Sequence, residues 1–159
     1  MGLIEMGCDI HTFAEKQNEE GVYEMIEGLA PFDSRSYGTF GFLAGVRNYS
    51  GVTPIAEPRG LPTDVGDDVK DEHESWSCDA HGTTWLTVAE LKAFDYDADM
   101  EDRRVTKRTA GGWLDGGCTA EPGEGQSMTY RKFLGEWFFQ DLQELEEAGA
   151  DRVVFWFDN

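Results

Sequence analysis

Basic residues are scarce in this 159-residue chain, and it has no long apolar run. Its 13 Lys and Arg side chains stand against 32 Asp and Glu side chains, for a net charge of −19. Binding to the phosphate backbone of a nucleic-acid duplex needs clustered cations, so this balance argues against it. No apolar run approaches the about 20 residues that a membrane-spanning helix needs. The first residues also lack the basic-then-apolar pattern of a signal peptide. We therefore expect a cytoplasmic protein with no membrane partner.

Cysteine is scarce as well. The three cysteines, Cys8, Cys78 and Cys118, are far apart and form no Cys-x-x-Cys pair. An odd, widely spaced set of this kind indicates neither a disulfide framework nor a zinc finger. We expect reduced thiols.

Apolar and aromatic residues are present in quantity, at 40% and 13% of the chain. That content is too high for a disordered acidic protein, and the length fits one domain over residues 1–159. The acidic surface has two interpretations. It can serve solubility or salt adaptation, which the scarcity of Lys relative to Arg favours, or it can mimic a nucleic acid and occupy the basic groove of another protein.

Local patterns predict an α+β fold with a small, mostly antiparallel sheet. Residues 8–16 and 22–26 indicate a β-hairpin that turns at Gly21. Residues 152–157 are almost continuously apolar, as in a strand buried on both faces. An apolar stripe at helical spacing over about residues 129–148 predicts a long C-terminal helix, with Gly149 as its stop. We expect this helix and shorter ones to pack against the sheet.

The shorter helices are predicted over residues 37–48, 64–74 and 87–95, the last from a Thr87–Glu90 capping box. The basic segment 103–108 has three interpretations: a mobile lid, an anion-binding edge, or an exposed stretch paired with nearby acids, which is the favoured one. It leads into a Gly-rich loop at about residues 109–126, which we expect to be flexible. These glycines do not match the P-loop pattern.

The segment Gly7–His11 is the strongest chemical signal. Because side chains alternate along a strand, Asp9 and His11 share one face while Cys8 lies on the other. His81 precedes a capped helix, where we expect an accessible loop. If folding brings them together, Asp9, His11 and His81 can act in acid–base catalysis or hold a divalent metal cofactor. The alternative is an ordinary strand histidine bonded to Asp9, and His73 is predicted to be solvated.

Isolated arginines in aromatic or proline-rich surroundings give a second set of candidates. Arginine suits bidentate recognition of phosphate or carboxylate, and the nearby Tyr37 and Tyr49 can stack on a base or form hydrogen bonds. Alternatively, Arg47 caps its helix and Arg59 pairs with Glu57. The candidate ligand-binding residues are Arg35, Tyr37, Arg47, Asn48 and Arg59.

These motifs resemble a family of small, mostly phage-encoded proteins that open with Met-Gly-Cys-Asp-Ile-His. That opening stands here at Met6–His11, and the similarity continues through Phe40–Asn48, Pro58–Asp64 and His81–Leu91. The family pattern near His81 has a second histidine two positions later, where this chain has Thr83. The departure weakens the case for two-histidine chemistry within that loop. The resemblance implies a viral origin, and hence the host cytoplasm, but no particular reaction.

Together these features favour a viral accessory protein that counters host defence by hydrolysing a phosphodiester in a small nucleotide signal. Two alternatives stay open. The protein could sequester such a nucleotide without cleaving it, or it could inhibit a host protein through its acidic surface. Homo-oligomerisation also stays open, and the enzyme needs either a divalent metal or no cofactor.

Overall fold

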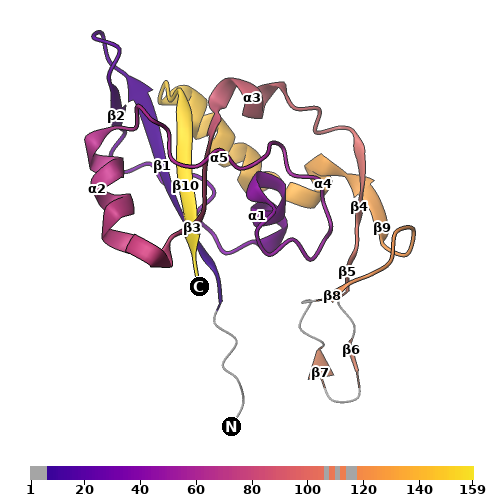
Figure 1. Ribbon diagram of the computed structural model, residues 1–159. Helices are drawn as coiled ribbons and strands as arrows, with labels where there is room; N and C mark the ends of the chain where they lie inside the picture. Colours follow the sequence, from indigo (N-terminus) through magenta and orange to yellow (C-terminus); the bar gives the residue numbers. More distant parts are fainter. Residues whose placement is uncertain (1–6, 106–107, 110–111, 114–117) are drawn as a thin grey trace. The chain divides into compact units, whose positions relative to one another are not determined.

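The computed structural model describes residues 7–105, 108–109, 112–113 and 118–159. The chain forms two compact units. Unit 1 comprises Met1–Arg35, Pro58–Ala93 and Gln140–Asn159, and unit 2 comprises Ser36–Glu57 and Phe94–Phe139. Helices and antiparallel strands occur in both (Figure 1), so the α+β prediction is confirmed. The single-domain assignment stays a prediction.

Unit 1 is built on a four-stranded antiparallel sheet. Its strands are β1 (Asp9–Gln17), β2 (Tyr23–Met25), β3 (His81–Thr87) and β10 (Arg152–Asp158), in the order β2-β1-β10-β3. The C-terminal strand β10, yellow in Figure 1, therefore lies between β1 and β3. The predicted hairpin and the predicted C-terminal strand are both confirmed.

The register of β1 on β10 sets which side chains share a face. His11 lies opposite Trp156 and Phe13 opposite Val154, while Ile10 lies opposite Phe157. Every residue of β10 from 152 to 157 is buried, as its continuous apolar pattern predicted for a strand covered on both sides.

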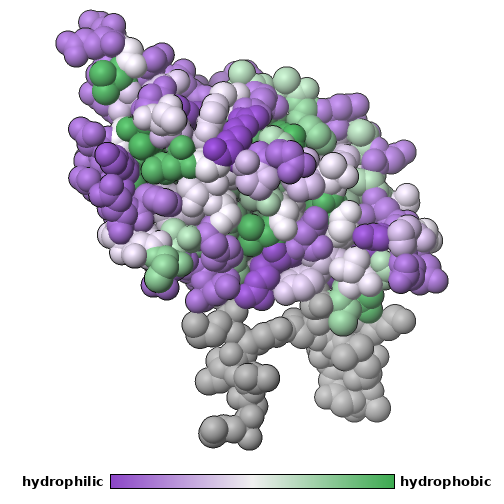
Figure 2. All heavy atoms as spheres, viewed as in Figure 1, coloured by the Kyte–Doolittle hydropathy of each residue, from purple (hydrophilic) through white to green (hydrophobic). Residues whose placement is uncertain are grey.

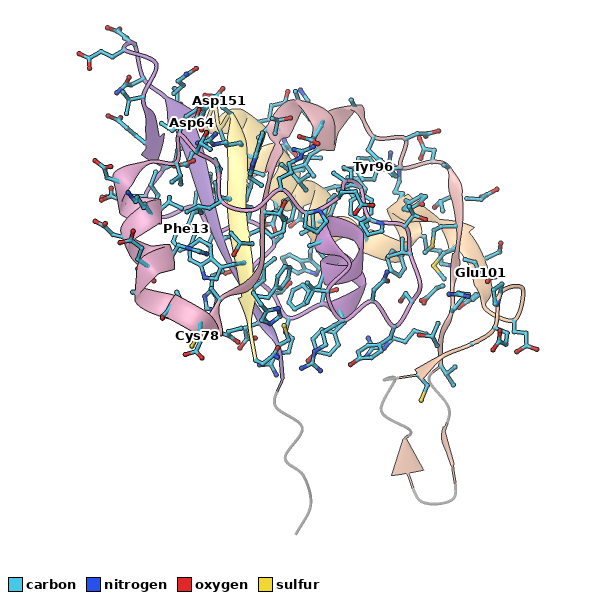
Figure 3. All side chains as sticks on the ribbon, in the orientation of Figure 1. Phe13, Asp64, Cys78, Tyr96, Glu101 and Asp151 are labelled. Carbon is cyan, nitrogen blue, oxygen red and sulfur yellow. The ribbon has the colours of Figure 1, made fainter. Side chains whose placement is uncertain are left out.

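The helix α2 (Asp67–Trp76) covers the His11 face of the sheet. Its Val69 forms a buried cluster with Val154 and Trp156, and Phe13 packs against that cluster. Figure 3 shows Phe13 between β1 and α2. A short 3-10 turn (Ser77–Asp79) leads from α2 into β3. The opposite face buries Ile10, Ala14, Leu86, Val153, Phe155 and Phe157.

The capping box predicted at the start of the third helix is present. The helix α3 (Val88–Ala93) follows β3 directly. Glu90 N–H donates to Thr87 Oγ1 at 3.1 Å, and Thr87 N–H donates to Glu90 Oε2 at 2.8 Å. The two residues thus satisfy each other's backbone amides at the beginning of the helix.

Unit 2 combines the helices α1 (Tyr37–Ala44) and α4 (Tyr130–Leu134) with short strand pairs. The strand β4 (Asp99–Asp102) pairs with β9 (Gln126–Thr129), and β5 (Arg104–Val105) pairs with β8 (Cys118–Thr119). The strands β6 (Arg108–Thr109) and β7 (Gly112–Trp113) form a third pair. The division between the units falls within α5 (Glu136–Glu147), whose Leu142 and Leu145 are buried.

Glycines with positive φ angles end two helices earlier than the apolar pattern predicted. α1 stops at Ala44 rather than continuing to residue 48, because Gly45 takes φ +70° and donates its N–H to Gly41 O. The long C-terminal helix is interrupted at Gly135, with φ +79°, which separates α4 from α5. The helix predicted over 64–74 begins three residues later, at Asp67.

The predicted flexible loop at 109–126 lies in good part outside the described residues. The described part of it includes the strands β7 and β8 and the first residue of β9. Elsewhere, hydrophilic side chains cover much of the face seen in Figure 2, as the excess of acids predicted. Among the described residues, the exposed large apolar side chains are Val22 and Trp137.

Candidate functional site

The Gly7–His11 segment lies at the beginning of β1 and is anchored by Arg35. Asp9 accepts hydrogen bonds from Nε and Nη2 of Arg35, both at 2.8 Å. The guanidinium also lies directly against Gly7, where a Cβ atom would collide with Nη1. Glycine at position 7 therefore admits the arginine, and Cys8 is fully buried on the opposite side. Gly7 and Asp9, which stood out in the sequence, thus both serve the ion pair with Arg35.

The hydrogen bonds from Arg35 hold the pKa of Asp9 below its ordinary range. A carboxylate with a lowered pKa stabilises the fold at neutral pH, and that contribution is lost as the pH falls through the lowered pKa. Both side chains are about half exposed, at 51%.

We predict that Arg35→Gln raises the pKa of Asp9 toward the ordinary value, because the charge-assisted hydrogen bonds disappear. A carboxyl-carbon NMR titration of the full chain measures this pKa. Arg131→Gln, which removes the partner of a different exposed carboxylate, Asp97, is the matched control and should leave Asp9 unchanged. An Asp9 titration that does not move in Arg35→Gln would contradict the assignment.

His11 is bonded to Asp158 and not to Asp9. Its Nε2 lies 2.7 Å from Asp158 Oδ2, and the side chains are 25% and 19% exposed. Trp76 of α2 packs on the imidazole, with ring centroids 4.2 Å apart. The strand alternation was predicted correctly, but Asp9 turns to Arg35 while Asp158, at the end of β10, reaches His11. Asp158 could not be predicted from the local pattern, because it reaches His11 through the pairing of β1 with β10, and the two residues are 147 positions apart.

His73 joins the same face, contrary to the prediction of a solvated side chain. Its Nε2 lies 3.0 Å from Thr83 Oγ1, and its ring meets Trp156 edge-on at a centroid distance of 4.8 Å. Trp156 is fully buried, and its Nε1 has no hydrogen-bond partner among the described residues. His11 lies 6.5 Å from the same indole. Two of the three histidines thus converge on Trp156.

His81 lies on the opposite face of the sheet from His11. It opens the strand β3, where a pre-helix loop was expected, and pairs with Phe157, whereas His11 pairs with Trp156. Its Nε2 is bonded to Asn159 Oδ1 at 2.9 Å. The structure therefore does not place the two imidazoles on one face as an acid and a base. In the part of the chain that the structure describes, no three His, Cys, Asp or Glu side chains are grouped to hold a metal ion. The metal set of Asp9, His11 and His81 stays a prediction.

Arg59 is engaged in a structural pair. Its Nη1 and Nη2 donate to the two carboxylate oxygens of Glu90 at 2.8 and 2.6 Å, and the guanidinium lies 4.7 Å from the Trp85 ring centroid. The Glu90 hydrogen bond raises the pKa of Arg59, and the same bond lowers the pKa of Glu90. The acidic partner is Glu90 rather than Glu57. The arginine therefore ties its proline-rich loop to β3 and α3.

The other predicted ligand residues, Tyr37, Arg47 and Asn48, lie together in unit 2. The guanidinium of Arg47 is 5.6 Å from the Tyr37 ring centroid. Asn48 bonds the backbone of Val52. The ring of Tyr49, also indicated by the sequence, lies beside that of Tyr37, and the structure adds Arg104 to this group. The basic segment 103–108 had marked the neighbourhood of Arg104, but sequence reasoning did not connect it to Tyr37.

No protein-family model, no curated protein and no solved structure matches this chain. The resemblance to phage-encoded proteins stays a prediction. Within the described residues, no helix is long and apolar enough to cross a membrane.

Proposed function

We propose that this protein hydrolyses a phosphodiester bond in a small nucleotide, with His11 as the general base. One observation carries the proposal: a partly exposed imidazole–carboxylate pair, His11 and Asp158, at the end of the sheet in unit 1. Such pairs orient an imidazole and select its tautomer, which is what a general base requires. The Arg35–Asp9 pair places a guanidinium near the same end of β1.

The hydrogen bond to Asp158 assigns the roles of the two ring nitrogens. With a proton on Nε2 donated to the carboxylate, Nδ1 carries the lone pair. None of the described residues is bonded to Nδ1. This nitrogen takes a proton from a water molecule as the water oxygen bonds to phosphorus. The bond from phosphorus to the leaving oxygen breaks, that oxygen takes a proton from solvent, and the imidazolium returns its proton to solvent.

Solvent supplies the second proton in this scheme because His81 is on the other face of the sheet. A single positioned base contributes about 10²–10⁴-fold to the rate. In the phage setting that the opening motif suggests, the reaction would remove a nucleotide signal of host defence.

The test is turnover of a panel of cyclic and linear dinucleotides by the full chain. His11→Ala is expected to lower kcat by at least about a hundredfold. Asp158→Asn should lower kcat less and shift the pH–rate profile, because it changes the orientation and basicity of the imidazole. Lys92→Gln, which alters an exposed ion pair with Glu146, is the control expected to keep full activity.

Three results would overturn the proposal. The first is no turnover of any substrate, and the second is turnover unchanged in His11→Ala. The third is a loss in His81→Gln as large as that in His11→Ala, which would favour the two-histidine scheme. Mass spectrometry after denaturation separates hydrolysis from sequestration, since a sequestering protein releases its nucleotide intact.

A further inference from the structure

Two arginines and two tyrosines form a cluster in unit 2, which we call the Tyr–Arg cluster: Tyr37, Arg47, Tyr49 and Arg104. The tyrosine ring centroids are 6.0 Å apart. The guanidinium of Arg104 lies 5.6 Å from the Tyr37 ring and 5.7 Å from the Tyr49 ring, and Arg47 lies 5.6 Å from Tyr37. All four side chains are half-buried. In a chain with 13 basic residues and a charge of −19, two guanidiniums beside the same two tyrosines are a local concentration of positive charge.

The loop that presents Arg47 and Tyr49 is braced by two hydrogen bonds between Asn48 and Val52. Asn48 Nδ2 donates to Val52 O at 2.7 Å, and Val52 N–H donates back to Asn48 Oδ1 at 3.0 Å. The amide side chain fits against α1 only because position 41 is glycine, where a Cβ atom would lie 2.6 Å from Asn48 Oδ1. Asn48 thus braces the loop that carries its two neighbours, and its role as a ligand residue stays a prediction.

The backbone of Arg47 is in the left-handed region, with φ +49°. Residues other than glycine occupy this region at an energetic penalty, and such outliers concentrate at binding and catalytic sites. The bracing by Asn48 maintains the conformation, and Arg47 Nη1 is directed to Tyr49 Oη at 3.3 Å. The residue with the unfavourable backbone conformation, Arg47, is therefore also one of the two that supply positive charge to the cluster.

A separate segment delivers Arg104. Arg103 N–H donates to Ser50 O at 2.9 Å, which joins the start of β5 to the loop, and Thr119 Oγ1 of β8 donates to Tyr49 O at 2.7 Å. The nearby carboxylate of Asp102 accepts the backbone N–H of Arg104. Three segments distant in the sequence are thus tied together at the cluster by hydrogen bonds to backbone carbonyls of residues 49 and 50.

We propose that the Tyr–Arg cluster binds a nucleotide, with the base stacked on a tyrosine ring and the phosphate held by Arg47 and Arg104. Tyrosine rings stack on any base, and guanidiniums bind phosphate in a planar, bidentate manner. The strongly negative charge of the whole chain repels a free anion, so local cations and a stacking surface are both needed. This site does not depend on the hydrolysis proposed for unit 1.

Equilibrium dialysis of the full chain with AMP, adenosine and inorganic phosphate tests the site. AMP has no phosphodiester bond, so its binding is measured independently of hydrolysis. We expect AMP to bind at least about tenfold more tightly than either adenosine or phosphate, because it engages both parts of the cluster. Arg47→Gln and Arg104→Gln should each weaken AMP at least about tenfold and leave adenosine nearly unchanged. Tyr49→Leu should weaken both AMP and adenosine.

Arg131→Gln is the matched control. Arg131 belongs to the same unit and lies 4.7 Å from the Phe139 ring, but its Nε is bonded to Asp97 at 2.8 Å. It should leave AMP binding unchanged. Arg104→Lys keeps the charge and should retain more AMP binding than Arg104→Gln, which guards against a variant that merely unfolds.

The proposal is overturned if AMP does not bind, if phosphate alone binds as tightly as AMP, or if Arg131→Gln weakens AMP as much as the cluster variants do. His11→Ala should keep full AMP binding. If AMP binds but no substrate is hydrolysed, the proposed hydrolysis by His11 is wrong and the nucleotide site stands. If a substrate is hydrolysed but AMP does not bind, the proposed nucleotide site is wrong and the hydrolysis stands.

Discussion

Replacing Arg152 with methionine is expected to destabilise unit 1 by about 3–5 kcal/mol, because it leaves a charged Glu15 buried without its partner. Arg152 and Glu15 are 4% and 0% exposed, and Nε donates to Glu15 Oε1 at 2.9 Å. The guanidinium also stacks on Tyr23, at 3.4 Å from the ring centroid, and Nη1 bonds Asp64. Among the described residues, the Glu15 carboxylate would then keep one hydrogen bond, from Gly66 N–H.

Urea unfolding of the full chain, followed by circular dichroism, measures this effect. The double variant Glu15→Met/Arg152→Met should recover much of the loss, since a buried ion pair can often be replaced by apolar side chains of similar volume. Asp64→Asn is the control. Its side chain is 65% exposed, and exposed ion pairs contribute at most about 1 kcal/mol. A loss in Arg152→Met no larger than that in Asp64→Asn would show that Glu15 is not left as an isolated charge.

Replacing Phe42 with alanine is expected to destabilise unit 2 by about 3–5 kcal/mol, the usual range for a deleted core phenylalanine. Phe42 is fully buried at the centre of the aromatic packing of that unit. Its ring lies 5.1 to 6.0 Å, between centroids, from four other rings: Phe94, Tyr96, Tyr130 and Phe138. The contacts with Phe94 and Phe138 are edge-on and stabilise the core beyond the apolar area that it buries. Truncation removes these contacts and the buried area, and it leaves a cavity.

Near-ultraviolet circular dichroism during urea unfolding follows the aromatic packing of the chain, including that around Phe42. Phe42→Leu, which keeps much of the volume, should lose clearly less stability than Phe42→Ala. Trp137→Ala removes an aromatic side chain that is 77% exposed and should change stability by about 0.5 kcal/mol or less. If Phe42→Ala were as mild as Trp137→Ala, the aromatic cluster would not be the core of the unit.

Local patterns predicted the elements whose stability depends on neighbours in sequence. The hairpin, the apolar strand β10 and the Thr87–Glu90 capping box were all found this way. The strand β3 was not, since Gly82, Thr83 and Thr84 have no strong strand pattern and become a strand by pairing with β10. The helix ends at Gly45 and Gly135 were also not predicted. The apolar spacing continues past each glycine, although the positive φ of the glycine ends the helix there.

The candidate sites show the same division. The sequence indicated His11, Arg35, Tyr37 and Arg47 as chemically capable residues, but it could not identify the partners that hold them. Asp158 reaches His11 because of the register of β1 on β10. Arg104 reaches Tyr37 because the neighbouring Arg103 N–H donates a hydrogen bond to Ser50 O in the 48–52 loop. The family resemblance and the nucleotide chemistry stay predictions.

By itself the sequence determined the α+β class, the two faces of β1 and the burial of β10, because alternation and apolar content act between adjacent residues. Only the tertiary structure decided that His11 pairs with Asp158, that His81 lies on the other face, and that Glu15 is buried against Arg152. These pairings join residues more than 60 positions apart. Their geometry follows from strand order and register, which burial of the whole sheet selects and no local pattern specifies.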